Sequence, residues 1–174
     1  TTDDTVKLGN PEYLQNIEVR SPIEIAKKLI PELRKQADIV IAVTNMGHYD
    51  NALHGENAPG DVTLARTVPG IDIIIGGHSQ DPLFKPDVQN GALIVQAHEW
   101  GKYVGQLDLI YKNGVISSSD YQLIPVNLKN KDVTNGNQSQ HRLLNDKIDE
   151  DPDMLNLLTP YEARGKKRAQ DQSR

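Results

Sequence analysis

The chain has 174 residues, enough for one domain of ordinary size, and its 24 acidic and 19 basic residues give a net charge of −5. This balance gives no reason to expect a nucleic-acid partner, because binding phosphates requires clustered cations. The absence of cysteine excludes disulfides and thiolate metal sites, and no apolar run approaches the roughly 20 residues that span a bilayer.

The first strong element is a helix that starts at Pro22. Ser21 is suited to cap it, Pro22 fits the first helical position, and Glu24 stands three residues after the cap. Apolar residues then recur at helical spacing and predict one buried face. That face comprises Ile25, Ala26, Leu29, Ile30 and Leu33. Pro31 predicts a kink near residues 27–30, because proline removes a backbone donor.

Three short apolar runs, 38–43, 71–75 and 92–97, predict buried strands. Between the first two, Asp61 is expected to cap a helix that runs through Val68. The longer stretches 104–111 and 115–126 alternate in part, and the Lys112-Asn113-Gly114 segment between them predicts a hairpin turn. The order of elements predicts an α/β fold with a mixed sheet and a C-terminal hairpin.

The last part of the chain differs in composition. Residues 129–150 are rich in Lys, Asn, Asp, Gln and Ser, which predicts an exposed excursion or a flexible linker. Residues 154–169 predict a partly exposed helix, with a break at Pro160. We therefore divide the chain into residues 1–128 and residues 129–174.

Three loops follow the predicted strands, at 44–50, 76–81 and 96–102. In open α/β sheets, ligands bind at the carboxyl ends of the strands. In the second loop, Gly76-Gly77 permits a tight turn, and His78 and Gln80 would face the same way in an extended segment. An imidazole nitrogen and an amide oxygen suit Zn²⁺ or Mn²⁺. The same spacing also fits a histidine that only caps a turn.

Other polar residues in these loops have structural and functional interpretations. His48 and Asp50 could form a catalytic His–carboxylate pair or a solvated loop contact. Trp100 is expected to anchor its own loop rather than to serve as a substrate platform. His98-Glu99 has no partner identifiable from the sequence, and His54 and His141 are expected at the surface.

Several of these segments resemble one family. The motifs NMGHYDN (45–51), GENAPGD (55–61), GGHSQDP (76–82) and VQAHEWGKYVG (95–105) are similar to the bacterial periplasmic 5'-nucleotidase/UDP-sugar hydrolases, which are calcineurin-like metallophosphoesterases. The resemblance implies part of a four-layer αββα sandwich, and two divalent ions drawn from Zn, Mn, Co or Mg. It also implies hydrolysis of nucleoside 5'-monophosphates and UDP-sugars, and a periplasmic location.

The resemblance also assigns residues. His78 and Gln80 match metal ligands, and Asn45 stands where the family has a ligand histidine. An Asn oxygen binds Zn²⁺ more weakly than imidazole does. The family's remaining ligands and its transition-state histidine lie upstream of Thr1, so we expect no catalytic residue in this chain and no activity from it alone. The substrate-binding residues stay unknown, and residues 129–174 are expected to include the start of an interdomain helix.

The missing layers lead to one further expectation. Without a first sheet, one face of the three predicted strands would be uncovered, which exposes more apolar surface than a monomer normally tolerates. We therefore expect the isolated chain to associate with itself or with a partner that covers this face.

Overall fold

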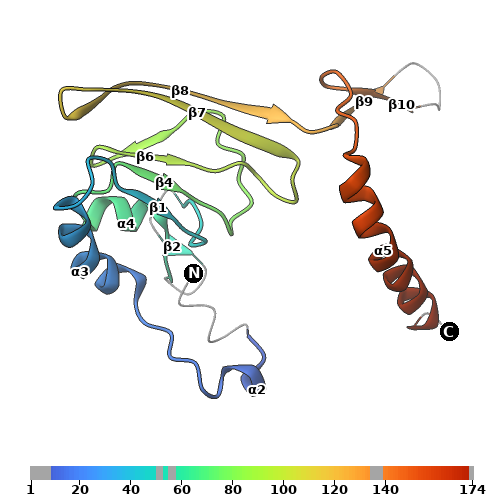
Figure 1. Cartoon of the computed structure of the whole chain (residues 1–174), viewed down its shortest axis with the longest axis horizontal. Coiled ribbons are helices and arrows are strands. Elements are labelled where there is room, and N and C mark those ends of the chain that lie inside the picture. The colour runs from blue at the N-terminus through green and yellow to red at the C-terminus, as the bar shows by residue number, and fades with distance from the viewer. Residues whose placement is uncertain (1–8, 50–52, 55–57, 134–138, 173–174) are drawn as a thin grey trace. The chain divides into compact units, whose positions relative to one another are not determined.

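A computed structural model describes residues 9–49, 53–54, 58–133 and 139–172 of the chain (Figure 1). These residues belong to two compact units that divide between Val126 and Asn127. The first unit holds an α/β layer, and the second holds a hairpin and a helix. The role of each part in a larger protein stays a prediction.

A four-stranded mixed sheet lies at the centre of the first unit, with the strand order β1-β4-β6-β5. Strands β1, β4 and β6 are parallel, and β5 is antiparallel to β6. Strand β1 starts later than its apolar run because the Val40 N–H donates to the Asp72 carboxylate (2.7 Å) instead of to a neighbouring strand. The bounds are β1 Ile41–Val43, β4 Ile73–Ile75, β5 Asp87–Gln89 and β6 Ala92–Val95.

Helix α3 (Pro22–Arg34) begins as predicted, with the Ser21 hydroxyl accepting a hydrogen bond from the Glu24 N–H (3.4 Å). Pro31 lies inside the helix and does not end it. The predicted buried face is wrong in part, because Leu29 and Leu33 are 54% and 44% exposed. Only the edge of the helix that carries Ile23 and Ile30 joins the core.

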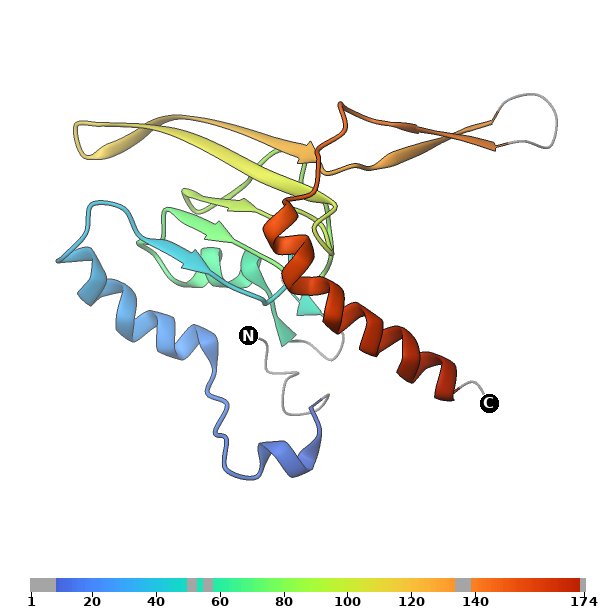
Figure 2. The same cartoon turned by 45° about the vertical axis from the view of Figure 1, so that its right-hand side comes forward.

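Helix α4 (Asp61–Thr67) corrects a second expectation, because Gly60 and not Asp61 occupies the capping position. Both α3 and α4 pack on the face of the sheet that carries Ile74 and Ile94 (Figure 2). A one-turn helix, α2 (Pro11–Leu14), precedes them. A short pair of strands, β2 (Leu53–His54) and β3 (Ala58–Pro59), lies between β1 and α4.

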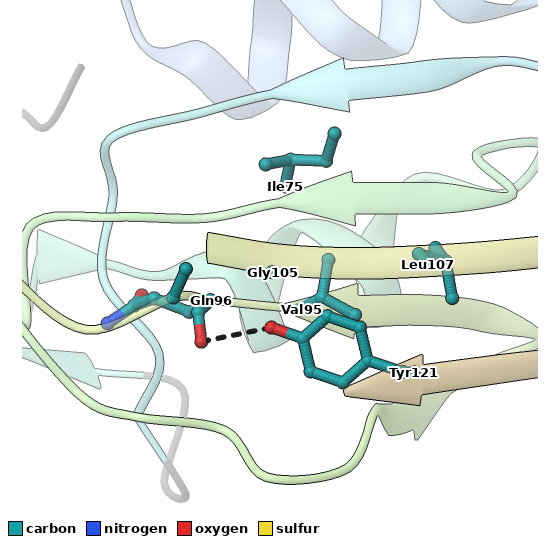
Figure 3. A pocket seen from close by; sticks show the side chains of 7 residues that line it. Ile75, Val95, Gln96, Gly105, Leu107 and Tyr121 are labelled. Atoms are coloured by element: carbon teal, nitrogen blue, oxygen red, sulfur yellow. Dashed lines mark hydrogen bonds between the residues drawn. The ribbon is translucent and has the colours of Figure 1, made fainter. Parts of the chain in front are cut away.

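The opposite face of the sheet is covered in part by a long hairpin, β7 (Tyr103–Lys112) and β8 (Val115–Pro125) (Figure 1). Its turn is confirmed, with φ of 52° at Asn113 and 82° at Gly114. A cavity of about 110 Å³ lies between the hairpin and the sheet (Figure 3). It is lined by Ile75, Val95, Gln96, Ala97, Gly105, Leu107 and Tyr121.

The face toward the hairpin is not covered evenly. Ile73 and Val95 are buried, whereas Ile41, Val43 and Ile75 are 51%, 79% and 43% exposed. The prediction that the run 38–43 forms a fully buried strand is therefore wrong. The side chains of β1 alternate between two faces, and among the described residues only the face toward α3 and α4 is covered.

In the second unit, part of the polar stretch forms an antiparallel hairpin, β9 (Lys129–Val133) and β10 (Ser139–Leu143), because backbone pairing does not require apolar side chains. The predicted break at Pro160 is wrong, because helix α5 (Pro152–Gln172) continues through this residue. The surface positions predicted for the side chains of His54 and His141 lie outside the described part. Within the described residues, no helix combines the length and the apolarity that a membrane span requires.

Candidate metal-site loops

The three loops singled out in the sequence lie at one edge of the sheet, since β1, β4 and β6 are parallel. Hydrogen bonds join them. The His48 N–H donates to the Ser79 hydroxyl (3.0 Å), and Nδ1 of His98 lies 2.6 Å from the Gln80 carbonyl oxygen, to which it donates. The structure therefore connects the loop after β4, which carries His78 and Gln80, to both neighbouring loops.

His78 occupies the centre of a three-residue turn. The Ser79 N–H donates to the Gly77 carbonyl (3.1 Å), and φ at His78 is 78°. This is the rarer and strained form of the γ-turn. The sequence analysis assumed that His78 and Gln80 lie in an extended segment and therefore face the same way. The segment is not extended, because φ is also positive at Gln80 (61°), so this assumption is wrong.

Unusual backbone conformations concentrate at these loops. Among the described non-glycine residues with positive φ, three are asparagines, which tolerate this region. The other four are His78, Gln80, His98 and Trp100, and all of them lie in the loops after β4 and β6. Such strain costs on the order of 1–3 kcal/mol per residue and gathers at functional sites.

Gln96, at the end of β6, holds the strained loop in place. Its side chain is buried, and its amide donates to the Ser79 hydroxyl (3.0 Å) and to the Asp81 carbonyl (3.1 Å). The Gln96 carbonyl accepts from the Tyr121 hydroxyl on the hairpin (3.3 Å; Figure 3). Sequence reasoning missed this residue, because its role depends on contacts between separate strands.

The Asp61 side chain packs against Gly76, the first residue of the Gly76-Gly77 pair. Its side chain is fully buried, and one carboxylate oxygen accepts from the Thr44 hydroxyl (2.6 Å). The other oxygen, Oδ2, has no hydrogen-bond partner in the described structure. A Cβ atom at position 76 would lie 2.3 Å from Oδ2, so the glycine at this position permits the close approach of Asp61.

Replacing Gly76 with alanine is therefore expected to destabilise the chain by about 2 kcal/mol, as overpacking of a tight interior does. Gly77→Ala is the matched control, because a Cβ there would lie 3.0 Å from Oδ1 of the exposed Asn45 side chain, which can move. Urea unfolding of both variants measures the difference. Equal losses of stability would contradict the packing argument.

Asp61 also has a perturbed charge state. Burial raises the pKa of its carboxyl to about 6, against the opposing effects of the Thr44 hydrogen bond and of nearby His48. The carboxyl group therefore titrates close to neutral pH.

Asn45, the third candidate ligand, lies beside the same loop. A Cβ atom at position 77 would lie 3.0 Å from the Asn45 amide oxygen, so this oxygen lies against Gly77, the residue before His78. One imidazole and two amide oxygens fit part of a divalent-ion site. Among the described residues, no three His, Cys, Asp or Glu side chains come together to complete one.

His48 has a carboxylate partner that the sequence did not indicate. Its Nε2 donates to the Asp87 carboxylate on β5 (2.9 Å), whereas Asp50 lies outside the described residues. Burial acts to raise the pKa of Asp87, but hydrogen bonds from His48 and Gln89 outweigh it and hold that pKa below its ordinary value. This hydrogen bond connects the loop after β1 to β5, the strand at the opposite edge of the sheet.

Trp100 does not anchor its loop, because 88% of its surface is exposed. It occupies a tight turn that the Lys102 N–H closes on the Glu99 carbonyl (3.0 Å). The two central residues have φ of 54° and 68°, a geometry that favours Asn-Gly rather than Trp-Gly. The expectation of an anchoring role was wrong because the turn leaves the indole in solvent.

The chain is similar to known proteins over nearly its whole length. The chain is 49% identical over 187 residues to Protein UshA of Escherichia coli K12, and 49% identical over 186 residues to a 5'-nucleotidase of Vibrio cholerae. Each match covers 95% of this chain and 34% of the relative. The chain thus spans about a third of the length of these relatives. No family model matches it.

Solved structures support the predicted fold class. A calcineurin-like phosphoesterase, YfkN from Bacillus subtilis, matches with a TM-score of 0.53 at 26% identity over 66% of this chain and 41% of that chain. A putative 5'-nucleotidase from Staphylococcus aureus matches with a TM-score of 0.60 at 19% identity over 88% of this chain and 28% of that chain. The α/β prediction is confirmed, and the layer described above is a part of the calcineurin-like phosphoesterase fold.

Proposed function

We propose that this chain, which belongs to the UshA and 5'-nucleotidase family over the region they share, supplies part of the metal site of a phosphohydrolase. The proposed substrates are nucleoside 5'-monophosphates and UDP-sugars, and the proposed location is the periplasm. The observation that carries the proposal is the strained turn at His78, held by Gln96 and Ser79 at the sheet edge where ligands bind.

In this proposal the chain's residues hold and orient the metal site. His78 would provide an imidazole nitrogen, and Gln80 and Asn45 would provide amide oxygens, to Zn, Mn, Co or Mg. A bound pair of such ions supplies an activated water and stabilises the charge that develops at phosphorus. The hydrogen bonds between the three loops keep these donors from moving apart.

The test restores the rest of the site. In a fusion protein, the segment that precedes the matching region in the Escherichia coli relative is joined to the N-terminus of this chain. We refer to this fusion as the restored protein. With Mn²⁺ or Zn²⁺, the restored protein is expected to hydrolyse AMP and a UDP-sugar, and this chain alone is not. A restored protein that is folded but inactive with every metal would overturn the proposal.

A second proposal concerns the chain by itself, as an inactive module that acts only in folding or association. The exposed side chains of Ile41, Val43 and Ile75 on one sheet face favour association. We expect the isolated chain to form a dimer or larger species in sedimentation, and Val43→Lys to shift it toward monomer. A wild-type chain that sediments as a monomer at all concentrations would contradict this.

Position 45 offers a direct check on the ligand set. Asn45→His in the restored protein is expected to raise Zn²⁺ affinity by about tenfold or more, because imidazole is the stronger ligand for zinc. Isothermal titration calorimetry with Zn²⁺ measures the change. An unchanged affinity would mean that residue 45 does not coordinate.

A further inference from the structure

His98, in the loop after β6, is bonded twice to the loop after β4 that carries Gln80. Its ring Nδ1 donates to the Gln80 carbonyl (2.6 Å), and its backbone N–H donates to the Asp81 carbonyl (3.3 Å). The first bond fixes the tautomer of the ring, because a carbonyl oxygen only accepts and Nδ1 must therefore carry the hydrogen. The Nδ1 side of this imidazole thus holds the backbone of the neighbouring loop.

The backbone at Gln80 has a conformation that glutamine seldom adopts. Its φ is 61°, and its side chain is exposed. Positive φ is uncommon for residues other than glycine and asparagine, so a Gln80 that nothing held would spend part of its time in ordinary conformations. Such a change would turn the Cα–Cβ bond, and with it the direction of the amide oxygen. The Gln80 carbonyl belongs to the next peptide group, so the bond from His98 acts against this change.

The position of the His98 ring is itself fixed by its surroundings. The ring lies beside that of Tyr103, with the ring centres 6.0 Å apart, and Tyr103 contacts Phe84 edge-on. The backbone of His98 is strained, with φ of 68°, at a position where asparagine or glycine would fit with less strain. A strained backbone at a partly exposed histidine indicates a use for this particular side chain.

We propose that His98 is a positioning residue for the metal site, which holds the backbone of Gln80 so that the Gln80 amide oxygen stays directed at the ion. This inference rests on the proposed function, since it requires Gln80 to be a ligand. His98 acts through its Nδ1–H and is not itself a ligand. Hydrogen-bond partners of metal ligands change metal affinity by about 10- to 100-fold, and a single bond to the backbone of a ligand belongs at the lower end of this range.

The first test compares two amide side chains at position 98 of the restored protein, with Mn²⁺ and Zn²⁺ affinities measured by titration calorimetry. The NH₂ group of asparagine is attached to Cγ, as Nδ1 of histidine is, whereas that of glutamine lies one bond further out and replaces Nε2 instead. His98→Asn is expected to keep the affinity within about twofold of the parent, and His98→Gln to lower it about tenfold. The reverse order, or equal affinities of the two variants, would overturn the proposal.

A double-mutant cycle shows whether His98 acts through the side chain of Gln80. His98→Ala is expected to weaken metal binding by about tenfold when residue 80 is Gln. In the Gln80→Ala background the same substitution is expected to change the affinity less than about twofold, because no amide remains to be directed. A loss of equal size in both backgrounds would contradict the proposal, since His98 would then support the loop as a whole.

Trp100→Asn is the matched control, because Trp100 lies in the same loop, also has positive φ (54°) and exposes its side chain to solvent. This variant is expected to leave metal affinity unchanged. If it weakens metal binding as much as His98→Gln does, the affinity follows the loop and not the hydrogen bond, and the proposal is wrong. Thermal unfolding of every variant shows whether a loss of metal accompanies a loss of fold. If His98→Ala does not fold, the comparison of His98→Asn with His98→Gln decides the question.

The variants also separate this inference from the proposed function. If His78→Ala binds metal as tightly as the parent, the proposed metal site is wrong and the role of His98 falls with it. If His78→Ala loses metal but the effect of His98→Ala does not depend on residue 80, the metal site stands and only the positioning role fails.

Discussion

His78→Ala is expected to lower AMP hydrolysis by the restored protein by at least about 100-fold, the upper limit for residues that merely support a ligand. The physical reason is that alanine removes the only imidazole among the proposed ligands, while its small side chain still fits the turn. Steady-state hydrolysis at saturating Mn²⁺ measures the loss, and metal content by elemental analysis shows whether an ion has left.

His141→Ala serves as the matched control, because His141 belongs to the second unit, which begins at Asn127, whereas His78 belongs to the first. Its replacement is expected to leave turnover unchanged. Thermal unfolding of the His78 variant checks that the fold survives, because alanine must adopt the same strained backbone. If its thermal unfolding is unchanged and its activity is also unchanged, His78 is a turn residue and not a ligand.

The sequence predicted the three parallel strands and the sheet edge at which their loops meet, because these depend on local signals. Short β-branched runs followed by polar loops indicate parallel strands whose carboxyl ends meet, and Asn113-Gly114 indicates a hairpin turn. The family resemblance added His78, Gln80 and Asn45 as ligands, an assignment that remains a prediction. The α/β class and the relationship to calcineurin-like phosphoesterases are confirmed.

What the sequence could not predict depends on contacts between distant segments. The amide of Gln96, the pairing of His48 with Asp87, and the burial of Asp61 behind Gly76 each join residues on different elements. The role of Asp61 was misassigned for this reason. An Asp before a helix usually caps it, but here Gly60 takes that position and the carboxylate turns to Thr44.

The buried state of Asp61 should make the stability of the chain fall as pH rises. Burial raises the pKa of Asp61 from 3.8 to about 6 in the folded chain. Between about pH 4 and pH 6 the unfolded chain therefore releases this proton while the folded chain keeps it. Stability declines across this window by about 3 kcal/mol, because the pKa rises from 3.8 to about 6, and Asp61 adds no further pH dependence below or above it.

Asp61→Asn isolates this contribution, because asparagine has nearly the same shape and does not titrate. Urea unfolding at about pH 4 and about pH 7 is expected to show the wild type losing about 3 kcal/mol relative to the variant as pH rises. Asp87→Asn is the control, since the pKa of Asp87 is held below its ordinary value of 3.8. The stabilisation from its ionised form is therefore gained almost entirely below about pH 4 and is expected to change little between about pH 4 and about pH 7. Stabilities of wild type and Asp61→Asn that run parallel across this range would show that Asp61 is ionised in the folded chain, and that the carboxylate behind Gly76 finds a partner that compensates its burial.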